Sequence, residues 1–200
     1  ILSGRLRLGV IPTLGPYLMP YVLPAAAEKL PNAPLVIVED LTGNLVPLVA
    51  QGKLDAAIIA TPPEPAELTS MELFDEPFWV ATPANHPLLA LKTVSASDID
   101  PKSLLLLADG HCLRDQVVDL CRQQEASIAG HADIRATSLE TLLHLTGAGF
   151  GVTLVPQMAI ESGRASGVQM SIRPLAGDDA TRRIRLIYRR NSPRLKALVE

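Results

Sequence analysis

The sequence predicts an α/β fold of two lobes, and two observations support this fold class. Through the first sixty residues, apolar β-favouring runs alternate with helical patterns in the order strand, helix, strand, helix, strand. This alternation is typical of a parallel sheet with helices on both faces. Near residues 75 and 178, strand-like stretches suit crossovers between two sheets. We therefore expect residues 1–75 and 179–200 in lobe I and residues 76–178 in lobe II.

The elements of lobe I follow from aliphatic runs and from helix-start signals. We expect strands over 5–11, 35–40 and 55–60, and helices over 16–30 and 44–54. Pro16 suits the first position of its helix, whereas Pro20 and Pro24 inside the same pattern predict a kink or a break. The Pro-rich stretch 61–68 is expected to be a loop.

The second half of the chain repeats the alternation of strands and helices. We expect strands over 71–74, 77–83, 103–108, 131–137, 151–156 and 181–190, and helices over 112–126, 138–149 and from 192 onward. Glycines at 147–151 follow a helix and precede a strand, which is the reverse of a dinucleotide-binding fingerprint. We interpret them as a helix end with tight packing on the next strand, and not as a phosphate site.

Composition limits the classes of function. The chain has 200 residues, a net charge of −3 and 20% charged residues, so it lacks the basic excess of a nucleic-acid-binding domain. No apolar run approaches a membrane span, and the start carries no export signal. The missing initiator Met indicates that a segment precedes this one, and we expect a cytoplasmic protein. Two cysteines are too few for a disulfide-stapled secreted fold.

The arginine-rich stretch 181–190 is a second charged feature. Its five arginines are interleaved with Ile184, Leu186 and Tyr188. This pattern favours a strand with one solvated face, with a docking patch for an acidic partner as the alternative.

Cys112 and Cys121 present the main chemical question. In one continuous helix, nine steps separate their Cα atoms by about 13 Å along the axis and place them on opposite faces. A disulfide needs Cα atoms within about 7 Å, so its formation would unwind the segment. Cys112 would begin the helix, where the dipole, His111 and Arg114 favour the thiolate. Two unrelated core cysteines remain the alternative, and a metal site is disfavoured because the Cys and His spacings do not fit.

Four motifs in order resemble the regulatory domains of the OxyR family, the peroxide-sensing LysR-type transcription regulators. These are "IPTLGPYLMP" (11–20), "GHCLRDQ" (110–116) with a cysteine nine residues after the first, "ATSLETL" (136–142) and "GAGFGVTLVP" (147–156). The resemblance runs from about residue 4 to about residue 190. It implies a type II periplasmic-binding-protein-like fold of two Rossmann-like lobes, preceded by an N-terminal winged helix-turn-helix domain that this segment lacks.

The resemblance also implies roles for particular residues. Cys112 would be the peroxidatic cysteine and Cys121 the resolving cysteine, with Arg114 and Asp115 as supporting residues of the same motif. The groups that it implies around hydrogen peroxide are Thr13, Thr42, His111 and Cys112. No cofactor and no metal are implied.

The resemblance further implies a bacterial transcription factor and not an enzyme. Its partners would be hydrogen peroxide, further copies in a homodimer or homotetramer, promoter DNA bound through the N-terminal domain, RNA polymerase and a glutaredoxin- or thioredoxin-type reductant. The closest rival is a LysR-type effector domain that binds a small organic ligand and has incidental cysteines. A thiol peroxidase is disfavoured because no C-x-x-C pattern is present, and a solute-binding protein would need an export signal.

Overall fold

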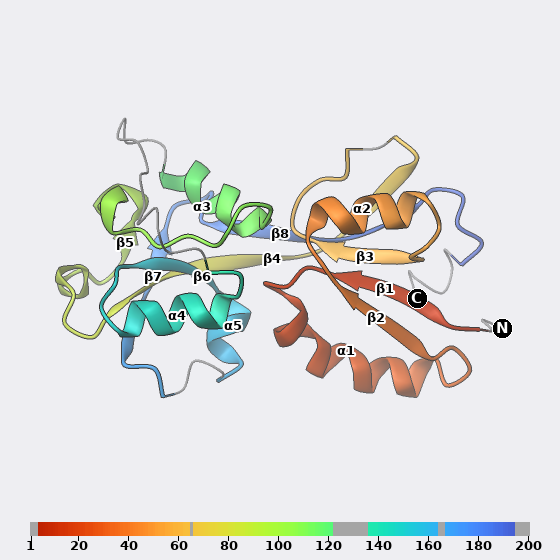
Figure 1. The fold of residues 1–200 in the computed structure, drawn as a ribbon, viewed down its shortest axis with the longest axis horizontal. Helices are drawn as coiled ribbons and strands as arrows, with labels where there is room; N and C mark the ends of the chain where they lie inside the picture. The colour runs from red at the N-terminus through yellow and green to blue at the C-terminus, as the bar shows by residue number, and fades with distance from the viewer. Residues whose placement is uncertain (1–3, 65, 122–135, 164–166, 195–200) are drawn as a thin grey trace. The chain divides into compact units, whose positions relative to one another are not determined.

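In a computed structural model, residues 4–64, 66–121, 136–163 and 167–194 are described, and the chain forms two compact units (Figure 1). Unit 1 contains residues 1–74 and 183–200, and unit 2 contains residues 75–182. The chain therefore changes unit at 74/75 and 182/183, where we had expected changes near 75 and 178. The assignment of these units to lobes of a regulatory domain stays a prediction. Among the described residues, no helix is long and apolar enough to cross a membrane.

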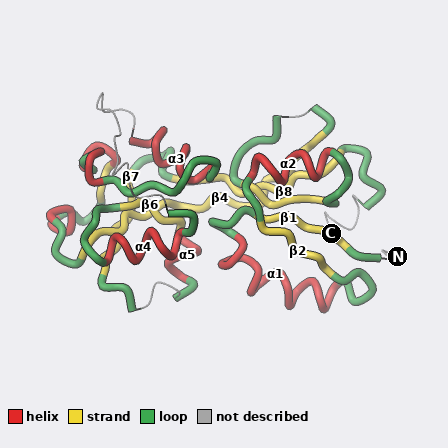
Figure 2. The backbone as a smooth tube through the Cα atoms, viewed as in Figure 1, coloured by secondary structure: helices red, strands yellow, loops and turns green. Residues whose placement is uncertain are grey.

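Unit 1 is built on three strands that run in parallel. Its elements are β1 (Leu6–Val10), α1 (Gly15–Lys29), β2 (Leu35–Glu39), α2 (Thr42–Ala50) and β3 (Ala56–Ile59). β1 pairs with β2 on one side and with β3 on the other, and β3 pairs antiparallel with β8 (Thr181–Arg189). Helices α1 and α2 cover opposite faces of this sheet (Figure 2). The strand–helix order expected from the sequence is confirmed.

Helix α1 continues through both of its internal prolines, so the expected break is wrong. Pro20 and Pro24 lie four residues apart, on one face of the helix, and both are exposed. The backbone carbonyls that lose a partner there are on the solvent side, where water can satisfy them. The apolar contacts of the other face, including buried Tyr17, keep the helix on the sheet.

Unit 2 has a central antiparallel group of strands. β4 (Leu68–Pro83) pairs antiparallel with β6 (Thr153–Pro156) and with β7 (Met170–Ala176), and β7 pairs in parallel with the short β5 (Val94–Ser95). The two strands expected at 71–74 and 77–83 are one strand. The intervening acidic pair does not interrupt it because Glu76 is buried and ion-paired with Arg182, at 2.8 Å.

The helices of unit 2 are short. They are α3 (Cys112–Cys121), α4 (Leu139–Gly147), α5 (Gln157–Glu161) and the 3₁₀ turns η1 (Pro87–Ala90), η2 (Ala96–Asp98) and η3 (Pro101–Ser103). The expected strand at 103–108 makes only isolated bridges, from Leu104 to Val152 and from Leu107 to Ala136. The parts of expected elements at 122–126, 131–135 and 195–200 lie outside the described residues.

The glycine cluster closes α4, as expected from its position. Gly149 has φ +89°, and a Cβ on Gly151 would lie 2.2 Å from the carbonyl oxygen of Ser103. At the other end of α4, the Ser138 side chain accepts a hydrogen bond from the Thr141 backbone N–H. The cluster is therefore a structural device that lets the chain turn and run close to residues 103–105.

The arginines of β8 do not share one solvated face. Arg182 is buried against Glu76, whereas Arg183 and Arg185 bind the exposed Glu72 at 3.1 and 3.0 Å. Arg189 donates to the carbonyl oxygens of Val49 and Leu54. The expected strand with one solvated face is confirmed over residues 181–186, where exposed or half-buried residues alternate with buried ones, but Arg182 lies on the buried side.

Candidate functional site

The first cysteine begins a helix whose start is fixed by neighbouring backbone contacts. Ala108 N–H donates to the Ala136 carbonyl, and Leu107 bridges to the same residue. Gly110 has φ +92°, which lets the chain turn into α3. Arg114 N–H then donates to the His111 carbonyl and closes the first helical turn. The sequence therefore places Cys112 at the positive end of the helix dipole, where a thiolate is favoured.

The structure shows the contacts of the charged and titratable residues that flank Cys112 in the sequence. The guanidinium of Arg114 donates to the Leu107 carbonyl at 3.1 Å and pairs with Asp109 at 2.9 Å. His111 is buried, and burial lowers its pKa. Near pH 7 this imidazole is therefore neutral and able to accept a proton. Asp115 is exposed in the first turn of α3, where a carboxylate stabilises the helix.

Cys121 ends the same helix and lies on its core-facing side. Leu113, Val117 and Cys121 are spaced by four residues, and all three are buried. Burial raises the pKa of the Cys121 thiol, so this thiol is protonated at neutral pH. Neither cysteine forms a disulfide.

The helix keeps the two thiols apart. Nine residues of α-helix separate Cys112 from Cys121 by about 13.5 Å along the axis and by half a turn around it. Both cysteines are buried, although they lie on opposite faces of α3. A bond between them requires loss of helical structure in this segment.

The two threonines lie at one edge of the sheet of unit 1. Thr13 follows β1 and is buried, and Thr42 follows β2 as the first residue of α2. Since β1 and β2 are parallel neighbours, their carboxyl ends meet at the same edge, which is the usual place for a ligand. A hydrogen bond from Asp40 N–H to the Val10 carbonyl joins the residue after β2 to the end of β1.

Thr42 has an unusual hydroxyl. Its Oγ1 is buried and has no hydrogen-bond partner within the part of the chain that the structure describes. A buried hydroxyl without a partner is costly, so its presence points to a ligand. Thr13 and Thr42 belong to unit 1, and His111 and Cys112 to unit 2. One peroxide pocket built from all four residues therefore stays a prediction.

Two of the remaining histidines, His86 and His144, are among the described residues. His86 accepts a hydrogen bond from Leu88 N–H at the start of η1, and His144 is exposed on α4. His131 lies outside the described residues. Among the residues with a described placement, no group of three His, Cys, Asp or Glu side chains could hold a metal ion.

Comparison with known proteins assigns the chain to a family. The profile of the LysR substrate-binding domain matches residues 2–200. This chain belongs to the LysR substrate-binding domain family. The family assignment and the type II periplasmic-binding-protein-like fold expected from the sequence are thereby confirmed.

Relatives of this LysR substrate-binding domain include peroxide regulators. A probable hydrogen peroxide-inducible genes activator of Mycobacterium avium is 41% identical over 193 residues, which cover 96% of this chain and 61% of the relative. The reduced regulatory domain of Pseudomonas aeruginosa OxyR is 36% identical, with a TM-score of 0.86 and coverage of 100% of this chain and 93% of that one. A hydrogen-peroxide-bound cysteine-to-serine mutant of Corynebacterium glutamicum OxyR is 38% identical, with a TM-score of 0.90 and coverage of 99% and 62%. The chain thus spans about three fifths of the curated relative.

Proposed function

We propose that this chain is the hydrogen-peroxide-sensing regulatory domain of a bacterial LysR-type transcription factor. The observation that carries the proposal is the placement of two reduced, buried cysteines at the two ends of the ten-residue helix α3. The peroxide-regulator relatives support it, because one is described as hydrogen-peroxide-bound. The domain acts once per oxidation event and is a sensor, not an enzyme.

The first step is attack on hydrogen peroxide by the Cys112 thiolate. One oxygen is transferred to sulfur, the O–O bond breaks, and hydroxide leaves, so that Cys112 becomes a sulfenic acid. The N-terminus of α3 stabilises the thiolate, and the neutral His111 imidazole takes up the thiol proton. The Thr13 and Thr42 hydroxyls orient the two peroxide oxygens in this proposal, which the unsatisfied Thr42 Oγ1 supports.

The second step joins the two cysteines. The Cys121 sulfur attacks the sulfenic sulfur of Cys112, a disulfide forms, and water leaves. This step requires α3 to unwind, which exposes Leu113 and Val117 at a cost of about 1.5–3 kcal/mol each. The disulfide is therefore strained and easily reduced, as a reversible signal requires.

In this proposal, the full-length transcription factor converts oxidation of the domain into a change in transcription. In this proposal an N-terminal winged helix-turn-helix domain binds promoter DNA, and oxidation changes the geometry of a homodimer or homotetramer and its contact with RNA polymerase. A glutaredoxin- or thioredoxin-type protein restores the thiols in the cytoplasm. These partners come from the family and not from contacts within this chain.

The test is stoichiometric oxidation followed by peptide mapping. One equivalent of hydrogen peroxide added to the reduced domain is expected to give one Cys112–Cys121 disulfide, and Cys112→Ser is expected to abolish peroxide consumption. Cys121→Ser is expected to stop the reaction at the sulfenic acid. If wild-type protein keeps both thiols reduced, the proposal fails, and a domain that binds a small organic effector becomes the preferred function.

A further inference from the structure

Arg114 ties the first turn of α3 to the segment that precedes the helix. Its guanidinium donates to the Leu107 carbonyl oxygen at 3.1 Å and pairs with the Asp109 carboxylate at 2.9 Å. The Arg114 side chain is only 33% exposed, whereas that of Asp109 is 85% exposed. The hydrogen bond to Leu107 is therefore the stronger restraint, because an exposed ion pair contributes little. These two contacts are called the Arg114 clamp below.

The segment that the clamp holds is itself fixed to other parts of unit 2. Leu105 N–H donates to the Val152 carbonyl at 2.7 Å, directly before β6. Ala108 N–H donates to the Ala136 carbonyl at 2.8 Å. Residues 105–108 therefore give the clamp a fixed support, and the clamp extends this support to the start of α3.

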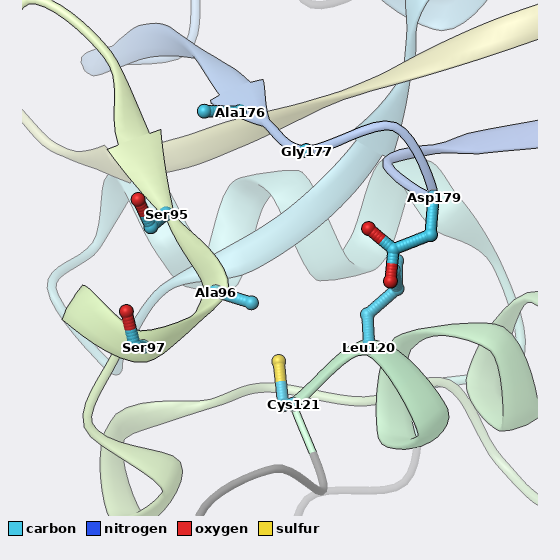
Figure 3. A pocket seen from close by; sticks show the side chains of 8 residues that line it. All are labelled: Ser95, Ala96, Ser97, Leu120, Cys121, Ala176, Gly177 and Asp179. Carbon is cyan, nitrogen blue, oxygen red and sulfur yellow. The ribbon is translucent and has the colours of Figure 1, made fainter.

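The clamp acts at the Cys112 end of α3. Cys112 is buried and stands two residues before Arg114 in the sequence. Figure 3 shows the other end of the helix, where the Cys121 sulfur points into a pocket beside Ala96 of η2. The two cysteines lie on opposite faces of α3, so a bond between them requires at least one end of the helix to turn about its axis. The clamp resists this turn at the Cys112 end.

We propose that Arg114 is a positioning residue, whose clamp holds the first turn of α3 in the dithiol form and has to break when the Cys112–Cys121 disulfide forms. This inference deepens the proposed peroxide-sensing function and rests on it for the oxidation by peroxide. As the Cys112 sulfur turns toward the opposite face, the first turn leaves residues 107–109, and both contacts of Arg114 are lost. The clamp thereby shifts the balance between the two forms toward the dithiol. Asp109 contributes by keeping the guanidinium in place.

The balance between the two forms is measured without peroxide, in mixtures of glutathione and glutathione disulfide. Two protein thiols reduce one glutathione disulfide to two glutathione molecules, and the protein gains the Cys112–Cys121 bond. Arg114→Gln is expected to shift this equilibrium about fivefold toward the protein disulfide, since a hydrogen bond and an exposed ion pair are lost. Asp109→Asn is expected to shift it about twofold, since only the ion pair is lost.

Arg173→Gln is the matched control for these variants. Arg173 also donates to backbone carbonyl oxygens, those of Leu89 and Ile172, which lie outside α3. Its equilibrium is expected to equal that of wild type. Because Asp109 acts through Arg114, Asp109→Asn is expected to add nothing in an Arg114→Gln background. The proposal is overturned by an unchanged equilibrium in Arg114→Gln, by an equal shift in Arg173→Gln, by full additivity of the two clamp variants, or by absence of the protein disulfide in every mixture.

Hydrogen exchange and peroxide kinetics separate this proposal from the proposed function. In the reduced domain, the amides of residues 116–118 in α3 are expected to exchange about fivefold faster in Arg114→Gln than in wild type, because the helix opens more readily. Conversion of the Cys112 sulfenic acid to the disulfide is expected to be faster by a similar factor. Equal exchange rates, or an equal rate of conversion, overturn the clamp. If peroxide oxidises Cys112 in no sample, the proposed function has failed, whereas the glutathione equilibrium still decides the role of Arg114.

Discussion

At the scale of single residues, burial determines what the histidine next to Cys112 can do. His111 is buried and its pKa is lowered below the ordinary value of 6.5, because desolvation disfavours the charged form. His111 is therefore neutral near pH 7 and adds no fixed positive charge beside Cys112. The attraction for the thiolate comes mainly from the start of α3.

The lowered pKa of His111 predicts how stability depends on pH. Between its folded and unfolded pKa values, the unfolded chain binds more protons than the folded one. The free energy of unfolding is therefore expected to decrease as the pH falls from 7.5 through about 6.5. Urea denaturation at pH 7.5 and 5.5 measures this. The decrease should be smaller in His111→Gln and should persist in the control His144→Gln, which changes an exposed residue of α4. If the free energy of unfolding of His111→Gln falls with pH as much as that of wild type, the pH dependence does not come from His111.

The unsatisfied hydroxyl of Thr42 predicts opposite effects on stability and on reactivity. Thr42→Val removes a buried polar atom without a partner, so the free energy of unfolding is expected to stay the same or to rise by about 1 kcal/mol. Peroxide oxidation of Cys112 is expected to slow about tenfold, because an orienting hydrogen bond is lost. Stopped-flow measurement of peroxide consumption gives the oxidation rate, and urea denaturation gives the free energy of unfolding. Thr93→Val, at an exposed position, serves as control. If the Thr42→Val variant reacts with peroxide at the wild-type rate, Thr42 is not part of the peroxide site.

At the scale of elements, the sequence predicts those helices and strands whose residues show a local periodic pattern. The strands and helices of unit 1 follow from runs such as 35–40, which β2 occupies over Leu35–Glu39. Cys112 as the first residue of a helix also follows from the pattern. The continuity of β4 does not, because it depends on a partner for Glu76 that is 106 residues away. The five-residue α5 is too short to produce a detectable period.

The two glutamates of β4 that pair with arginines of β8, one buried and one exposed, predict very different mutational effects. Glu76 is buried and accepts from Arg182 and from the Met158 backbone N–H. Glu76→Gln removes the carboxylate that neutralises the buried Arg182 charge and is expected to lower the free energy of unfolding by about 3 kcal/mol.

Glu72 is the matched control for this pair. Its ion pairs with Arg183 and Arg185 are exposed at the carboxylate, so Glu72→Gln is expected to cost less than about 1 kcal/mol. Equilibrium urea unfolding of both variants makes the comparison. Equal losses would show that burial does not decide the strength of these contacts.

At the scale of the whole molecule, α1 and β2 of unit 1 are suited to contact a second copy of the chain. Tyr21 and Leu23 of α1 are 67% and 45% exposed, and β2 is the edge strand of the sheet. We expect a homodimer through α1 and β2, since exposed aromatic and aliphatic side chains of this kind are common at the centre of interfaces.

Sedimentation velocity tests the dimer. Tyr21→Glu with Leu23→Glu is expected to weaken the dimer about thirtyfold or more, which corresponds to the loss of about 2 kcal/mol. Phe150→Glu changes an exposed aromatic residue of unit 2 and is the control. A wild-type protein that stays monomeric at millimolar concentration in both redox states would contradict the expected interface.

The central claim is that peroxide forms a Cys112–Cys121 disulfide only by unwinding α3, and hydrogen exchange of the reduced and oxidised domain tests it most directly. In the reduced state, the amides of residues 116–121 donate to carbonyls within the helix and should exchange slowly. After oxidation by one equivalent of peroxide, with the disulfide mapped on the same sample, protection is expected to be lost across residues 116–121 and kept in β1, β2 and β3. Unchanged protection in α3 alongside a mapped Cys112–Cys121 bond would contradict the account.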